Sequence, residues 1–124
     1  MNPRLLAQII AAGRVVVGAV LFISTARVTR PWVGEAEGSR TGTRVMAMGL
    51  GARDVVVGAG TLATIGQGGG AAKPWLVGSL AADAMDLAAT LRAAGQIPAA
   101  SVAGVALVAG GAAAAGAYVL SQDV

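Results

Sequence analysis

Apolar residues in this chain gather in long blocks, and polar stretches separate the blocks. Four of these blocks are close to the roughly 20 residues that a helix needs to cross the hydrocarbon core of a bilayer. We therefore expect four membrane-spanning helices, at residues 5–26, 45–66, 75–94 and 97–120.

The connections between these blocks predict the topology. A polar loop, Arg27 to Arg44, joins the first two spans, and the other connections, around Gln67 to Pro74 and Gly95 to Gln96, are short. Short connections force neighbouring helices to run antiparallel. The sequence thus predicts an all-α fold: one integral membrane domain over residues 1–124, built as a four-helix up-down transmembrane bundle.

The composition agrees with a membrane protein. The 124 residues are 56% hydrophobic and only 12% charged, whereas a soluble domain is roughly 45–50% apolar and about 25% charged. The alternative is a soluble Ala/Gly-rich helical bundle, whose helices would each carry a single apolar stripe. Because the apolar residues form whole blocks instead, we expect this protein to lie in the lipid bilayer of the plasma (inner) membrane.

The first span follows a short basic start and could be taken for a secretory signal. Arg14 interrupts its apolar core, and the apolar run continues well beyond the length of a signal sequence. We interpret it as a retained membrane helix.

Basic residues are expected to be enriched on the cytoplasmic side. If the first and third connections face the cytoplasm, five arginines lie inside, and only Arg4 and Lys73 lie outside. This distribution predicts that both termini face out. The five are Arg27, Arg30, Arg40, Arg44 and Arg92.

Three aromatic residues lie where a span is expected to meet the membrane surface. Trp32 follows Pro31, which we expect to stop the first helix. Trp75 follows Pro74 at the start of the third span, and Tyr118 lies near the end of the fourth. Amphipathic rings favour the headgroup level, so we expect all three to be interfacial anchors.

Several functions are excluded or disfavoured by what the sequence lacks. With no Cys and no His, thiol chemistry, disulfides, His-based acid/base work and the usual zinc sites are excluded. The net charge is +3, but the basic residues are scattered, without the clusters and interleaved aromatics of nucleic-acid binding. We expect no metal, no cofactor and no nucleic-acid partner.

Charged residues lie inside three of the apolar blocks at matching depths. Arg14, Arg53, Asp54 and Asp83 each fall about nine or ten residues into their spans, and Asp86 shares a helix face with Asp83. Charges inside a bilayer are costly and pair with one another. We expect these five residues to meet across the bundle interior, and we call them the charge network.

Glycines flank the Arg-Asp pair of the second span on both of its sides. Small residues let helix backbones approach closely, so we expect neighbouring helices to pack there. The expected packing glycines are Gly51 and Gly58 on the side of Asp54, Gly49 and Gly60 on the side of Arg53, and Gly18 in the first span.

Two positive and three negative charges leave the network one negative charge over. One carboxylate could stay protonated, bind a cation or face a water-filled cavity. The network either only fixes the packing of the bundle or forms a functional polar site, and the sequence leaves both interpretations open.

Two segments resemble a known group of proteins: Gly13–Phe22 (GRVVVGAVLF) and Gly49–Gly58 (GLGARDVVVG). They resemble small four-helix integral membrane proteins of actinobacteria that are grouped under domains of unknown function, and more distantly DoxX-like membrane proteins. The resemblance implies a four-helix bundle. It implies no established activity, and Asp83 and Asp86 are not matched to it.

We predict a non-enzymatic accessory or scaffold subunit that packs against itself, as a homo-oligomer, or against a larger membrane protein. The alternative is a small proton- or ion-coupled transporter, with Asp83 or Asp86 as the titrating group and Arg14 or Arg53 as its countercharge. A metal-dependent enzyme would need a third ligand beside the two aspartates, and none accompanies them in the spans.

Overall fold

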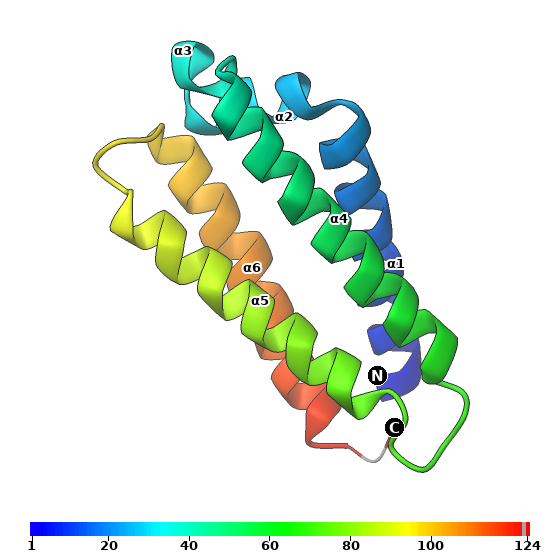
Figure 1. The fold of residues 1–124 in the computed structure, drawn as a ribbon. Helices are drawn as coiled ribbons and strands as arrows, with labels where there is room; N and C mark the ends of the chain where they lie inside the picture. Colours follow the sequence, from blue (N-terminus) through cyan, green and yellow to red (C-terminus); the bar gives the residue numbers. More distant parts are fainter. Residues whose placement is uncertain (123) are drawn as a thin grey trace.

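A computed structural model describes residues 1–122 and 124, and these residues fold into helices without any strand (Figure 1). The all-α prediction is therefore confirmed. The helices are α1 (Pro3–Ile23), α2 (Thr25–Val33), α3 (Glu35–Gly38), α4 (Thr41–Thr64), α5 (Lys73–Arg92) and α6 (Ala99–Leu120).

Prolines and an asparagine mark where the long helices begin. Asn2 precedes α1, and its side-chain oxygen accepts hydrogen bonds from the backbone N–H groups of Arg4 (3.0 Å) and Leu5 (3.4 Å). Such a cap satisfies N–H groups that have no partner in the first helical turn. Proline also occupies the first turn of α1 and of α5, where its missing N–H costs nothing.

Three helices, α1, α4 and α6, are long and apolar enough to cross a membrane, which indicates a membrane protein. The fourth expected span corresponds to α5, which does not belong to this set. Asp83 and Asp86 interrupt the apolar stretch of α5, and Lys73 and Arg92 lie at its ends. Four spans were expected, but by length and composition only three helices could cross a membrane.

The polar loop folds into two short helices, which corrects the expected end of the first span. α1 ends at Ile23, and the chain turns at Ser24, so residues 25 and 26 belong to α2. Pro31 does not stop the first helix but lies inside α2. The buried hydroxyl of Thr29 donates to the carbonyl of Gly38 (2.7 Å), which ties α2 to α3.

The four long helices alternate in direction, with α1 packed most closely on α4 and α5 on α6 (Figure 1). The two termini lie at one end of the molecule, and α2 and α3 lie at the other. The connection between α4 and α5 turns through Gly68, Gly69 and Gly70, which all have positive φ angles. A buried apolar cluster closes the terminal end: Ala7, Ile65, Ala72, Leu76 and Val119.

Candidate functional site: a buried charge network

Helices α1 and α4 touch backbone to backbone at glycines. A Cβ atom added to Gly18 would stand 2.5 Å from the carbonyl oxygen of Gly51, and one added to Gly51 would stand 2.5 Å from that of Gly18. Gly58 faces the carbonyl of Ala11 at the same distance. Because these distances exclude any side chain, the contact places the charged residues of the two helices within reach of one another.

The two glycines expected on the Arg53 side behave differently from each other. At Gly60 a side chain would overlap the indole ring of Trp75, so α4 and α5 pack tightly there. Gly49 is exposed, and an added Cβ would meet nothing within 4 Å. The prediction that Gly49 packs against a helix of this chain is therefore wrong. On this face α5 approaches closely near the connection between the helices, and farther along, the long side chain of Arg53 spans the distance.

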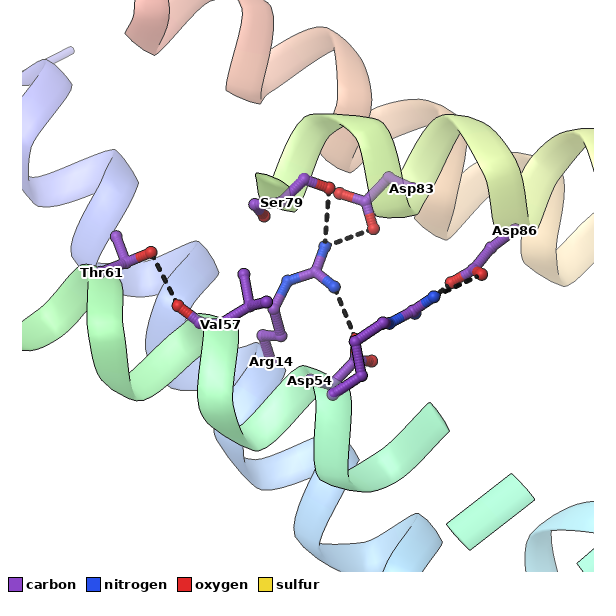
Figure 2. Close-up of polar contacts among 8 residues, drawn as sticks. Arg14, Asp54, Val57, Thr61, Ser79, Asp83 and Asp86 are labelled. Carbon is purple, nitrogen blue, oxygen red and sulfur yellow. Dashed lines mark hydrogen bonds and ion pairs between the residues drawn. The ribbon is translucent and has the colours of Figure 1, made fainter. Parts of the chain in front are cut away.

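Arg14 of α1 joins α4 to α5. Its Nη1 donates to Oδ1 of Asp54 (2.7 Å), and its Nη2 donates to Oδ1 of Asp83 (Figure 2). Nη2 also lies 3.4 Å from the carbonyl oxygen of Ser79. Arg14 and Asp83 are 7% and 6% exposed. One buried guanidinium thus holds side chains from two other helices.

Arg53 of α4 makes the second link to α5. Its Nη1 and Nη2 donate to the two carboxylate oxygens of Asp86 (3.0 and 2.6 Å), a bidentate pair. Its Nε and Nη2 also reach Oδ1 of the adjacent Asp54 (3.2 and 3.0 Å). Arg53 and Asp54 therefore contact each other besides serving neighbours, because the flexible arginine side chain folds back along its own helix.

The structure thus brings all five residues of the charge network together. Asp54 accepts from both arginines, while Asp83 and Asp86 accept from one each. Two buried polar atoms have no hydrogen-bond partner among the described residues, Nε of Arg14 and Oδ2 of Asp83. A water that accepts from the Nε–H group of Arg14 or donates to Oδ2 of Asp83 would complete the network.

A small cavity of about 10 Å³ lies beside Arg14, lined also by Thr61 and Ser79. A water molecule needs at least about 10–15 Å³ of this volume and two or more polar partners. The cavity is therefore at the lower limit for a single water. The contribution of Thr61 was missed by sequence reasoning, since a lone threonine among apolar residues gives no signal of a cavity.

Two larger cavities lie away from the network. One of about 360 Å³ opens at the terminal end, between Arg4, Lys73 and the connection that contains Gly68–Gly70. The other, of about 310 Å³, is an apolar groove between α2 and α4 that Trp32 and Met46 help to line. Neither cavity is lined by a residue of the charge network. Among the described residues, no cluster of His, Cys, Asp or Glu could hold a metal ion.

No family model, curated protein or solved structure matches this chain. The resemblance of Gly13–Phe22 and Gly49–Gly58 to actinobacterial and DoxX-like membrane proteins therefore stays a prediction. The structural argument about function depends on the charge network and its surroundings.

The expected anchors lie near helix ends, with different surroundings. Trp32 is half-buried near the end of α2, and Tyr118, near the end of α6, is 43% exposed. Trp75 is half-buried in the first turn of α5 and covers Gly60. The packing role of Trp75 could have been anticipated from the short connection that precedes it, which keeps the start of α5 close to the end of α4.

Proposed function

We propose that this protein is a small, non-enzymatic integral membrane protein that acts as a scaffold or accessory subunit. The observation that carries the proposal is the pairing of Arg14 with Asp54 and Asp83. It joins three helices at a buried position that neither large cavity reaches. A pairing buried in this way fixes helix packing, and the two large cavities give a solute no route to it.

In this proposal α5 crosses the membrane beside α1, α4 and α6, which completes a four-helix up-down bundle. A charged residue at a helix centre costs about 2.5–3.5 kcal/mol on insertion scales, so α5 with its two aspartates is marginal alone. Its pairing with Arg14 and Arg53 supports insertion together with α1 and α4. The resemblance to four-helix actinobacterial membrane proteins agrees with this arrangement.

The proposed topology places both termini outside the plasma membrane. α2 and the start of α4 lie at the end opposite the termini (Figure 1), and they carry Arg27, Arg30 and Arg44. Arg4 and Lys73 lie at the terminal end, near the same cavity. The excess of arginine at the α2–α3 end supports a cytoplasmic location for that end.

One observation favours the alternative, a proton- or ion-coupled transporter. The side chain of Asp86 is 33% exposed, so a proton could reach it more easily than it could reach Asp83. The alternative also requires an access route from one membrane surface, and the two large cavities do not supply it.

Reconstitution into liposomes that contain a pH-sensitive dye distinguishes the two functions. The scaffold predicts the same proton leak with and without protein under an imposed pH gradient. A protein-dependent flux that Asp86→Asn abolishes would establish the transporter instead. Purification in mild detergent is the second arm: the scaffold predicts a particle larger than one chain, and a lone, stable monomer would contradict it.

A further inference from the structure

The Arg53–Asp86 pair is open on one side, unlike the rest of the charge network. The side chains of Arg53 and Asp86 are 31% and 33% exposed, whereas that of Arg14 is 6% exposed. Both open residues lie inside their helices: Arg53 is in the middle of α4, and Asp86 lies six residues before α5 ends at Arg92. Ionised groups at such a depth normally face protein or water and not lipid. Something other than an acyl chain is therefore expected to cover this pair.

The neighbourhood of the pair leaves room for another helix. Gly49 lies one helical turn before Arg53 on the same face of α4. It is exposed, and an added Cβ would meet nothing within 4 Å. The other glycines near the Arg-Asp pair of α4, Gly51, Gly58 and Gly60, each contact another helix of the chain. Gly49 is thus a site of possible close approach that no helix of the same chain uses.

We propose that a second copy of this chain docks on the α4–α5 face around Gly49, Arg53 and Asp86. A two-fold axis there would place Arg53 of each copy beside Asp86 of the other. The charge of the surface argues for this occupant, because the open pair presents one cation and one anion. Arg53 and Asp86 already bind each other within one chain, so this surface carries no net charge. A symmetric dimer presents the same surface from both sides and places each charge beside its opposite, whereas a partner helix with one charge would bring a charge that nothing balances.

This inference rests on the proposed scaffold function and names its partner. Cysteine cross-linking tests it directly, since the chain contains no cysteine. A disulfide forms only between Cα atoms that come within about 7 Å. We expect Gly49→Cys to give a covalent dimer on mild oxidation in proteoliposomes. Gly104→Cys is the matched control: it is also an exposed glycine in open space, on α6, and should stay monomeric on a denaturing gel.

Gly49→Leu provides an independent measurement. A leucine in open space leaves the fold of one chain intact but blocks close approach of a second chain. Native mass spectrometry should show a dimer for the wild type and for Gly104→Leu, and a folded, helical monomer for Gly49→Leu. Three outcomes would overturn the proposed surface. These are equal cross-linking of Gly49→Cys and Gly104→Cys, a cross-link to a different protein in native membranes, and a dimer that survives Gly49→Leu.

Failure of this inference and failure of the proposed function give different results. A wild-type chain that still assembles, but through a surface that Gly49→Leu does not affect, remains a scaffold with another interface. A wild-type monomer that carries out an Asp86-dependent proton flux contradicts the scaffold itself.

Discussion

Arg14 of α1 and Asp83 of α5 are 69 residues apart in the sequence, and they meet in a buried contact at which Nη2 donates to Oδ1. The other terminal nitrogen of Arg14 donates to Asp54 of α4. A guanidinium presents several donors in a fixed fork, so one side chain can hold two carboxylates in a defined geometry. This geometry orients α1, α4 and α5, whose buried apolar side chains are mostly those of alanine.

Removal of an arginine from the network should be strongly destabilising. Loss of one partner from a buried ion pair costs about 3–5 kcal/mol, because the remaining charge is stranded. Arg14→Ala should show this cost in unfolding by denaturing detergent, and Arg53→Ala should show a smaller part of it because that pair is more exposed. Arg40→Ala is the control, since the side chain of Arg40 is 73% exposed. Equal stability of the three variants would refute a buried network.

We expect Asp83 to be protonated, which removes the surplus negative charge of the network. All three carboxylates pair with an arginine, but of their oxygens only Oδ2 of Asp83 is buried without a partner among the described residues. Two arginines then balance two carboxylates. Asp83→Asn should therefore cost much less stability than Asp54→Asn, and it should remove an infrared band of a protonated carboxyl group. A band that persists in Asp83→Asn, or the reverse order of stabilities, would assign the proton elsewhere.

Two glycine substitutions on α4 should change the free energy of unfolding in opposite directions. Gly51→Ala places a Cβ 2.5 Å from the carbonyl of Gly18, and such overpacking typically costs about 1–3 kcal/mol. Gly49→Ala meets open space and should stabilise the helix by roughly 0.5–1 kcal/mol, because alanine loses less backbone entropy than glycine. The free energies of unfolding of Gly51→Ala and Gly49→Ala, measured under the same conditions, check this difference. Equal changes in stability would argue against the α1–α4 contact.

The proposed topology predicts which exposed positions can be labelled in intact cells. Lys73→Cys at the terminal end should react with a membrane-impermeant maleimide added from outside. Arg27→Cys in α2 should react only after the cells are opened. Both positions are exposed, so burial does not account for a difference in labelling. Labelling of Arg27→Cys from outside, with Lys73→Cys labelled only in opened cells, would place the termini in the cytoplasm.

Sequence reasoning reached the charge network through depth alone. Arg14, Asp54 and Asp83 lie at similar distances from the ends of their apolar blocks, and antiparallel helices bring such positions to one level. The direction of each side chain was harder to anticipate, because Arg53 is long enough to reach both Asp54 and Asp86.

Local geometry was predicted less well where tertiary contacts decide it. The break at Ser24 and the helix that contains Pro31 depend on contacts of α2 with α3, such as that between Thr29 and Gly38, and no periodic pattern encodes them. Gly49 and Gly60 share one face of α4, yet only Gly60 is covered, because the distance between α4 and α5 varies along their length. A pattern of small residues shows where helices can approach, and the packing of the whole chain decides where they do.

A double-mutant cycle between Arg14 and Asp54 tests the central claim most directly. Arg14→Met, Asp54→Leu and the double variant would be unfolded in bicelles beside the wild type. If the buried pair joins α1 to α4, the coupling energy should be about 1–3 kcal/mol. The exposed pair Arg40–Glu37, with 3.6 Å between its charged atoms, should give less than about 1 kcal/mol in the same cycle. A coupling energy of zero for Arg14 and Asp54 would contradict the proposal that these charges hold the helices together.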